Sequence, residues 1–282
     1  MRSLGELGYE APDLETIRHA LRGPEGLVLV VGPAGSGRRT SLYSMLDELD
    51  PARNRVHTIE SSLLRPVPRW RQLHMSNGRY PRNWRRWERA FGRILFGGAD
   101  AILVEQIATP GVAQLAIQAA RTGHLVLSTM ALGRACSVIA ELRRLQVTTA
   151  QVIDALTLVI GQRLLRRLCP ECSRPEDREA VRRALASALN TWLGGYAVHA
   201  RRPAPSGCAR CGYSGYHGRV LAYELVDIDA RARGLIASAI DPVELERALL
   251  ADGASIWDRG LKRVAEGSTS FDALQAAVRQ PG

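Results

Sequence analysis

Five consecutive apolar residues at Leu27–Val31 run directly into the glycine-rich segment Gly32–Gly37, and this junction constrains the fold most strongly. An unbroken apolar run of this length is typical of a strand that is buried on both faces of a parallel sheet. Further strand candidates occur at 56–60, 101–104 and 125–129, and segments with helical spacing separate them. This alternation predicts an α/β fold in which helices cover both faces of a doubly wound sheet.

The remaining elements are predicted from local spacing and from end signals. A lead-in helix is expected within 1–24, a strand at 219–227, and a loop rich in Pro, Arg and Ser at 61–83. Asp241–Glu244 combines an N-cap acid, a proline at the first helical position and a glutamate at the third, which indicates a helix start. Further helices are predicted at 40–49, 84–95, 110–122, 134–145 and 149–167, and the C-terminal segment is expected to be mostly helical.

The segment between the first strand and the first long helix has the composition of a phosphate-binding loop. Glycines let backbone amides approach phosphate oxygens closely, and the N-terminus of the following helix adds positive potential. The general pattern Gly-x-x-x-x-Gly-Lys-Ser/Thr is matched except at its last two positions, Arg38 and Arg39. The candidate nucleotide-binding residues are Gly32, Pro33, Ala34, Gly35, Ser36, Gly37, Arg38, Arg39 and Thr40.

Both substitutions change the chemistry of this loop. Arg38 keeps a positive charge, but its planar guanidinium is wider than the ammonium group of lysine. Arg39 stands where a serine or threonine hydroxyl would ligate Mg²⁺, and one cation does not ligate another. The Thr40 hydroxyl is rotated by about 100° around the helix, so we expect it to point elsewhere. A former phosphate loop that now only caps a helix is therefore an alternative interpretation.

Four of the five cysteines form two CxxC pairs, Cys169 with Cys172 and Cys208 with Cys211. Each pair can present two thiolates on one side of a tight turn, and two such turns complete a tetrahedral four-sulfur site. In a chain with no export signal, paired cysteines favour metal over disulfides. We predict a structural zinc ion with no open coordination position, and redox dithiols are the alternative. Cys136 is expected to be a packing residue on an apolar helix.

The chain has a formal net charge of +10, and Lys262 is its only lysine. A solvated basic surface is the simplest interpretation, with nucleic acid, acidic lipid or an acidic partner subunit as alternatives. Arginines cluster at 82–89 around Trp84 and Trp87, which also suits an exposed helix with one apolar stripe. No apolar run approaches the roughly 20 residues of a membrane helix, and the N-terminus lacks a signal-peptide core. We expect a cytoplasmic protein whose attachment to a membrane, if any, would be through partners.

Several segments together resemble the ATPases of type II secretion and type IV pilus assembly. The matching segments are Gly32–Tyr43, Thr58–Glu60, Asp100–Val104, Ala113–Ala120, Thr122–Thr129, Gln162–Pro170, Gly215–Arg219 and Tyr223–Leu225. They correspond to the phosphate loop, the aspartate box, the Walker B region and the two ends of the zinc element. The resemblance implies a lead-in segment at 1–22, a RecA-like P-loop nucleotide-binding domain at 23–168, a zinc-binding element at 169–215 and a mostly helical subdomain at 216–282.

The same resemblance indicates where the chain departs from the catalytic residues of that family. Members carry a glutamate two residues after the Walker B strand, where it polarises the attacking water, and the matching residue here is Gln106. Glu105 lies one position earlier, and on an extended segment it would point to the opposite face. The aspartate box keeps Glu60. In the same box, Ser61 and Ser62 stand where Asp and Pro are expected. Ala131 replaces the histidine of the histidine box, and Ala108 replaces an arginine.

Three functions are compatible with these features. The first is ATP binding with weak or absent hydrolysis, in a regulatory or structural subunit of a secretion or pilus system. The second is an active ATPase that uses Glu60 and Glu105 in an unusual geometry, with Gln106 as the third candidate catalytic residue. The third is a basic zinc-bearing protein that binds nucleic acid.

The resemblance also implies cofactors and partners. Zinc is expected as a structural ion and ATP as the nucleotide, whereas Mg²⁺ loses a ligand at Arg39. Family members work as hexamers, so we expect this chain to form a hexamer, to join full-length ATPase subunits in a mixed ring, or to contact an inner-membrane platform. The resemblance covers only the C-terminal ATPase half of the family, and the N-terminal recruitment domains are expected to be absent.

Overall fold

The computed structural model describes residues 1–75, 84–179, 181–183, 185, 198–238, 242–250 and 255–279. The chain forms two compact units. One comprises Met1–Gly161 and Leu225–Leu249, and the other comprises Gln162–Glu224 and Leu250–Gly282. Each unit thus combines segments that are distant in the sequence. The division of the chain at residues 22, 168 and 215 stays a prediction about domain boundaries.

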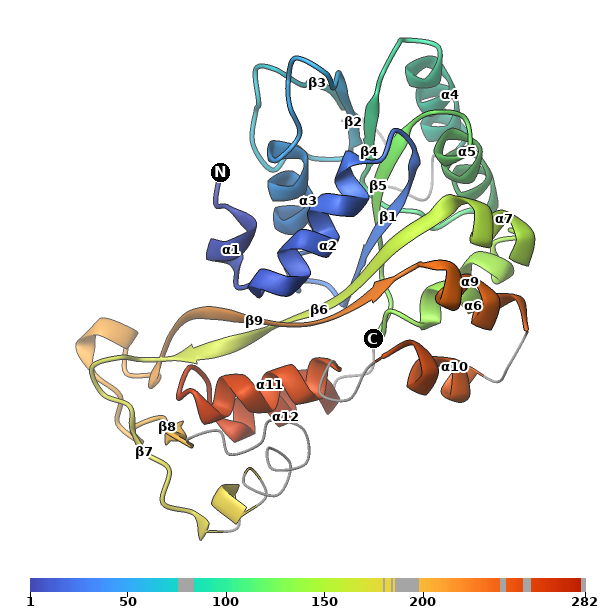
Figure 1. The fold of residues 1–282 in the computed structure, drawn as a ribbon. Helices are drawn as coiled ribbons and strands as arrows, with labels where there is room; N and C mark the ends of the chain where they lie inside the picture. Colours follow the sequence, from blue (N-terminus) through green and yellow to red (C-terminus); the bar gives the residue numbers. More distant parts are fainter. Residues whose placement is uncertain are drawn as a thin grey trace. The chain divides into compact units, whose positions relative to one another are not determined.

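A seven-stranded sheet has the strand order β3-β2-β4-β5-β1-β6-β9 (Figure 1). Its strands are β1 (Gly26–Val31), β2 (Val56–Glu60), β3 (Arg71–His74), β4 (Ala101–Val104), β5 (Leu125–Met130), β6 (Leu156–Leu168) and β9 (Tyr216–Asp227). The pairs β2–β3, β2–β4, β4–β5, β1–β5 and β1–β6 are parallel. The α/β fold with a mainly parallel sheet is therefore confirmed. Because β1 lies between β5 and β6, its carboxyl end opens near the middle of the sheet, where ligands bind in such folds.

The first unit carries helices on both faces of its strands, with α3 on one side and α4 and α5 on the other (Figure 1). Its helices are α1 (Leu4–Leu7), α2 (Ala11–Arg22), α3 (Arg38–Asp47), α4 (Trp84–Leu95), α5 (Pro110–Ala120), α6 (Ser137–Arg144), α7 (Thr149–Ala155), α9 (Ala230–Ala237) and α10 (Pro242–Leu249). The start of α5 follows the sequence signal, because the Thr109 hydroxyl accepts a hydrogen bond from Val112 N and Pro110 occupies the first turn. Across the described residues, each helix is too short or too polar to span a lipid bilayer.

The predicted helix at 149–167 is wrong over most of its length. Helix α7 ends at Ala155, and the thirteen residues of β6 follow it directly. β6 pairs with β1 in parallel, so its residues complete the hydrogen bonds of a buried strand that would otherwise form an edge. Its start is rich in β-branched residues, at Thr157, Val159 and Ile160, which favour strands over helices.

Three smaller differences have similar causes. Residues 71–74, predicted to be loop, form the short strand β3, whose mostly exposed side chains give no apolar signal. The lead-in helix is two helices, because Gly8 ends α1 in the left-handed conformation at φ 107°. Strand β9 begins at Tyr216 rather than at 219. The helix start at 242–244 is confirmed, whereas its proposed cap Asp241 lies outside the described residues.

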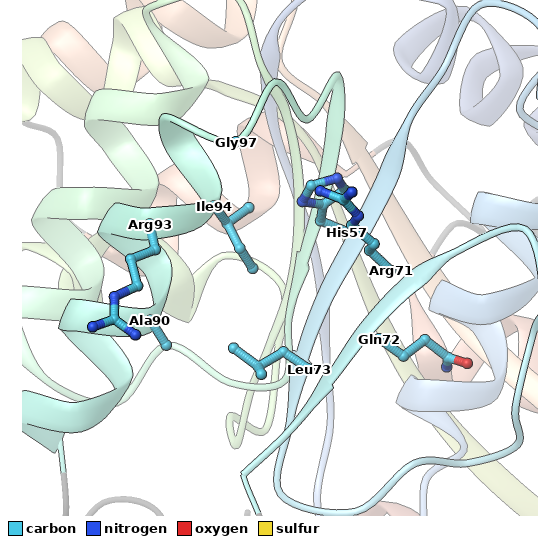
Figure 2. A pocket seen from close by; sticks show the side chains of 8 residues that line it. All are labelled: His57, Arg71, Gln72, Leu73, Ala90, Arg93, Ile94 and Gly97. Carbon is cyan, nitrogen blue, oxygen red and sulfur yellow. The ribbon is translucent and has the colours of Figure 1, made fainter.

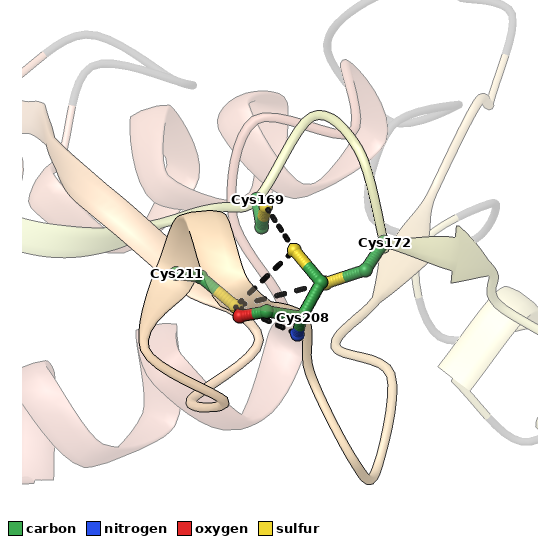
Figure 3. Close-up of side chains that lie close together, drawn as sticks. All are labelled: Cys169, Cys172, Cys208 and Cys211. Atoms are coloured by element: carbon green, nitrogen blue, oxygen red, sulfur yellow. Dashed lines mark hydrogen bonds between the residues drawn. The ribbon is translucent and has the colours of Figure 1, made fainter.

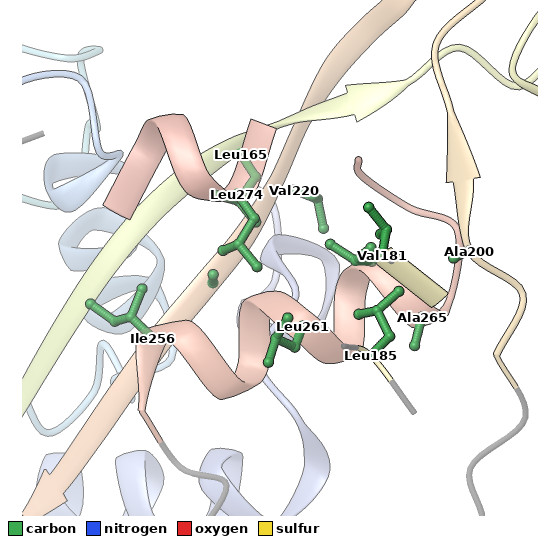
Figure 4. Close-up of a cluster of buried hydrophobic side chains, with 11 residues drawn as sticks. Leu165, Val181, Leu185, Ala200, Val220, Ile256, Leu261, Ala265 and Leu274 are labelled. Atoms are coloured by element: carbon green, nitrogen blue, oxygen red, sulfur yellow. The ribbon is translucent and has the colours of Figure 1, made fainter. Parts of the chain in front are cut away.

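The second unit has its own hydrophobic core, shown in Figure 4. Helices α11 (Ile256–Ala265) and α12 (Phe271–Arg279) pack side by side, and a short antiparallel pair joins β7 (Arg174–Pro175) to β8 (Arg201–Arg202). The core consists of Leu165, Val181, Leu185, Ala200, Val220, Ala222, Ile256, Leu261, Val264, Ala265 and Leu274. Leu165 and Val220 come from β6 and β9, so the ends of the two long strands contribute to this core.

Candidate functional site

The loop between β1 and α3 has the backbone conformation that its glycines permit. Gly35 and Gly37 adopt left-handed φ angles of 76° and 87°, and Gly37 forms the N-cap of α3. A side chain at either position would meet the strain of that conformation. The ten-residue helix α3 follows at once and adds its N-terminal amides to the site. The local geometry therefore matches a loop that can hold phosphate oxygens with backbone N–H groups.

A cavity of about 230 Å³ lies against this loop. Its lining residues are Gly35, Ser36, Gly37, Arg38, Arg39, Thr40, Glu105, Gln106 and Thr129. The structure therefore brings six of the nine candidate loop residues together with two of the three candidate catalytic residues. The other loop residues, Gly32, Pro33 and Ala34, are not among the described residues that line it, and neither is Glu60. Thr40, which the sequence predicted to point elsewhere, is exposed and contributes to the lining.

Arg38 is attached to the end of a neighbouring strand. Its Nη1 donates a hydrogen bond to the carbonyl oxygen of Met130, at 2.6 Å, on the last residue of β5. Burial of the guanidinium lowers the pKa of Arg38, although arginine still carries its charge at neutral pH. Its positive charge is thus fixed beside the loop rather than free to follow a ligand, as a flexible lysine would be.

Arg39 forms an ion pair with Glu60, the last residue of β2. The Nη2 to Oε2 distance is 2.9 Å, and the Glu60 side chain is 0% exposed. The hydroxyls of Tyr43 and Thr58 also lie 2.8 Å from the Glu60 carboxylate and donate to it. Burial, followed by this carboxylate, raises the pKa of Tyr43 to about 12, so the phenol keeps its proton and remains a donor. The Glu60 carboxylate thus accepts hydrogen bonds from one cation and two hydroxyls.

Glu105 and Gln106 follow β4 directly, where the sequence predicted the water-activating residue. Both Glu105 carboxylate oxygens accept hydrogen bonds from Ser61, one from its backbone N–H and one from its hydroxyl at 2.9 Å. The Thr129 hydroxyl donates to the backbone carbonyl of Glu105 at 2.8 Å, which fixes this segment against β5. Ser61, which replaces an acid of the aspartate box, therefore holds Glu105 in place. The side chain of Gln106 is only partly buried at the cavity wall.

The four cysteines of the second unit meet in one cluster, shown in Figure 3. Their sulfur atoms all lie within 4.8 Å of one another. The Sγ separations are 3.7 Å for Cys169–Cys208 and 3.8 Å for both Cys172–Cys211 and Cys208–Cys211. A tetrahedral ion with Zn–S bonds of about 2.3 Å needs sulfur separations of about 3.8 Å. The donor set and its spacing therefore fit zinc.

The Cys211 thiol also accepts two backbone hydrogen bonds. The N–H groups of Cys208 and Gly215 each lie 3.2 Å from its sulfur. An ion pair of 2.7 Å between Arg210 and Glu171 links the two CxxC turns beside the cluster. Such contacts around metal-binding thiolates orient the ligands before the ion binds.

Among the glycines of this element, Gly207, directly before Cys208, is expected to tolerate replacement least. Its φ is 57°, and a Cβ atom there would lie 2.4 Å from the backbone carbon of Tyr213. Gly207→Ala should therefore lower the free energy of unfolding by about 2–4 kcal/mol and reduce bound zinc. Thermal unfolding and metal analysis of the purified protein would measure both effects.

The matched control for this prediction is Gly212→Ala. Gly212 follows Cys211 and has nearly the same φ, 58°, but no atom lies within 4 Å of the position of its Cβ. Gly212→Ala should lower the free energy of unfolding only by the cost of a left-handed backbone conformation, about 1–2 kcal/mol, and should leave zinc binding unchanged. Equal losses for the two variants would contradict the close approach of Tyr213.

The arginine-rich segment 84–95 forms the amphipathic helix α4. Trp87 is 1% exposed and belongs to the core, whereas Arg85, Arg86 and Arg89 are exposed. For these residues the interpretation as an exposed helix with one apolar stripe is confirmed. Arg82 and the side chain of Trp84 lie outside the described residues.

A second cavity, of about 280 Å³, lies between β2, β3 and α4 (Figure 2). Its lining residues are His57, Arg71, Gln72, Leu73, Ala90, Arg93, Ile94 and Gly97. Burial lowers the pKa of His57, and the neighbouring Arg71 and Arg55 lower it further. The sequence gives no signal for this cavity, because its residues come from three segments that carry no shared motif.

Comparison with known proteins identifies relatives of this chain. The sequence model of the family described as "Type II/IV secretion system protein" matches residues 1–276. The chain is similar to the protein transport protein HofB homolog of Escherichia coli K12, at 33% identity over 98% of this chain and 57% of that protein. It is similar to the type II secretion system ATPase E of Vibrio cholerae, at 30% identity over 98% of this chain and 53% of that protein. The chain thus spans about half the length of the curated relatives that it matches.

Two solved structures share the fold. The X-ray structure of the Legionella pneumophila ATPase DotB has a TM-score of 0.65 at 17% identity, covering 98% of this chain and 64% of that chain. The crystal structure of the pilus retraction motor PilT, with bound ADP, has a TM-score of 0.66 at 21% identity, covering 100% of this chain and 68% of that chain. At these identities the likeness establishes the fold alone, and it confirms the α/β architecture expected from the sequence.

Proposed function

Because this chain belongs to the type II/IV secretion system protein family, we propose that it binds ATP and hydrolyses it weakly or not at all. The observation that carries this proposal is the wall of the loop cavity. Gln106 lines this cavity and, by the resemblance to the family, takes the water-activating position, while Gly35 and Gly37 of the loop have left-handed φ angles that suit phosphate binding. A glutamine side chain can hold a water molecule but cannot take its proton.

The two remaining carboxylates do not supply a free base in this geometry. Glu60 is buried and paired with Arg39, and it accepts from Tyr43. Both oxygens of Glu105 accept from Ser61. A general base must lie within reach of the proton it abstracts, and loss of one such group slows a reaction by about 10²–10⁴-fold. The alternative of an active ATPase built on Glu60 and Glu105 would require both carboxylates to exchange these partners.

The four-cysteine cluster is proposed to hold a structural zinc ion. Cys169, Cys172, Cys208 and Cys211 supply four thiolates at tetrahedral spacing, so no coordination position is left for a reacting water. When bound, zinc would cross-link the two CxxC turns. It would take no part in phosphoryl transfer.

The proposed role is that of a regulatory or structural subunit of a type II secretion or type IV pilus system. The relatives include the type II secretion system ATPase E of Vibrio cholerae, of which this chain matches 53%. We propose that the chain acts in the cytoplasm, at the inner membrane, through full-length ATPase subunits in a mixed ring or through the membrane platform. The comparisons lend no support to the alternative of a basic protein that binds nucleic acid.

Binding and turnover should be measured separately on purified, zinc-loaded protein. We expect labelled ATP to bind with saturation while phosphate release stays at the level of the buffer blank. A full-length family ATPase, measured in the same assay, provides the reference rate. Turnover close to that reference would establish the active ATPase instead, and absence of binding in every buffer would leave only the helix-capping interpretation of the loop.

A further inference from the structure

The residues around the phosphate loop do not fit a bound magnesium ion. Mg²⁺ requires near-octahedral oxygen ligands, and in phosphate loops one of them is the hydroxyl that follows the lysine. Here that position is Arg39, whose guanidinium can only donate hydrogen bonds. A cationic side chain therefore occupies the sequence position of the hydroxyl that ligates the ion in phosphate loops.

The oxygen atoms that might replace the missing ligand are already committed. The Glu60 carboxylate accepts hydrogen bonds from Arg39, Tyr43 and Thr58 at 2.8–2.9 Å, and it is fully buried. The Glu105 carboxylate accepts two hydrogen bonds from Ser61. Among the described residues that line the loop cavity, Glu105 is the only carboxylate. A magnesium ion would have to displace these donors and also approach the guanidinium.

The Arg39 guanidinium is held in place but keeps one donor for a ligand. Besides Glu60, it donates to the hydroxyl of Ser62 at 3.2 Å and to the carbonyl oxygen of the same residue. These three bonds use both Nη2 donors and one Nη1 donor, so one Nη1 N–H is left for a ligand in the cavity, whereas the Nε N–H is buried without a hydrogen-bond partner. Its side chain is 29% exposed and contributes to the cavity lining beside Arg38. A guanidinium N–H donates a charge-assisted hydrogen bond to a phosphate oxygen, which is about twice as strong as a bond between neutral groups.

We infer that this loop binds nucleoside triphosphate as the magnesium-free anion, with the Arg39 guanidinium, anchored on Glu60, providing the positive charge that the metal ion supplies elsewhere. The inference rests on the proposed ATP-binding function and specifies its ligand. Mg²⁺ neutralises two of the negative charges of ATP and coordinates oxygens of its outer phosphates. The magnesium complex therefore presents less negative charge to Arg38 and Arg39. It also brings a second cation toward Arg39, which like-charge repulsion opposes.

The test compares the affinity for ATP with and without magnesium, using the full chain. Chelators would remove zinc from the cysteines, so buffers and nucleotide are instead depleted of divalent ions on a chelating resin, and zinc content is verified. In a titration with a fluorescent ATP analogue, the dissociation constant without Mg²⁺ should be lower than that in millimolar Mg²⁺ by a factor of about ten or more. A factor of ten corresponds to about 1.4 kcal/mol. Binding that requires Mg²⁺ would overturn the inference and leave the proposed ATP binding intact. Absence of binding in both buffers would overturn both.

Variants at position 39 provide an independent check. Arg39→Thr restores a hydroxyl ligand and frees Glu60, so it should reverse the preference and make binding tighter with Mg²⁺. If the threonine variant does not fold, Arg39→Lys serves as the test. Lysine keeps the ion pair with Glu60, so this variant should still bind magnesium-free ATP more tightly. The matched control is Arg53→Thr, which removes an arginine that is 85% exposed in a surface turn and should leave both affinities unchanged. A threonine variant that folds and still prefers magnesium-free ATP would contradict the role of Arg39.

Discussion

Replacing Arg38, Arg39 and Gln106 together by Lys, Thr and Glu is expected to raise ATP turnover by about 10²-fold or more above that of the unaltered chain. The loop and the strands that position it are intact, so the substitutions return chemical groups to an existing scaffold. Glu at 106 would accept the proton of the attacking water, and Thr at 39 would offer a hydroxyl to Mg²⁺. Phosphate release under saturating magnesium and ATP measures the gain.

Single variants separate the contributions to this result. Gln106→Glu alone should give little turnover while Arg39 still opposes the metal ion, because groups that act as one unit are not additive. Arg39→Thr alone should change the metal dependence of binding without producing a base. An unaltered chain that already turns over ATP quickly, with no gain in the triple variant, would show that Glu60 and Glu105 suffice in their present geometry.

Cys211→Ser is expected to abolish zinc binding and to unfold the second unit at moderate temperature. The Cys211 sulfur lies 3.8 Å from two other cysteine sulfurs and accepts two backbone N–H bonds, so no other atom can replace it. Binding of structural zinc contributes about 10–16 kcal/mol in isolated zinc-finger peptides, which is comparable with the stability of a whole domain. Hydrogen exchange would detect the loss as faster exchange in β6, β9 and α11.

The control for this variant is Cys136→Ser, which removes the one cysteine outside the cluster. It should keep one zinc ion per chain and a nearly unchanged unfolding profile. The core of the second unit, which includes Leu261 and Leu274, offers an alternative source of stability. Unaltered exchange in zinc-free Cys211→Ser would mean that this core holds the unit without the metal.

Sequence predictions are accurate where the signal lies within one short segment, and they fail where the structure depends on pairing with a distant segment. The strands at 27–31, 101–104 and 125–129 are correctly predicted, because residues buried on both faces must be apolar throughout. The short strand β3 has exposed side chains, and it exists through its backbone pairing with β2, which no local pattern reports. The start of β6 is predicted as helix because a short, mostly apolar run such as 156–160 suits either state. Its pairing with β1, more than 120 residues earlier in the chain, decides between them.

The amino-acid sequence by itself determined the glycine-rich loop, the two CxxC pairs and the identities of Arg38, Arg39 and Gln106. These features are local, because glycine conformation, thiol spacing and side-chain chemistry depend on residues a few positions apart. Only the tertiary structure decided which partners the charged side chains of this site contact. Arg39 meets Glu60 and Glu105 meets Ser61 because α3, β2 and β4 converge at one end of the sheet. Side chains separated by 21 and 44 positions in the chain become neighbours there, and a buried carboxylate is stable only beside the partners that this convergence supplies.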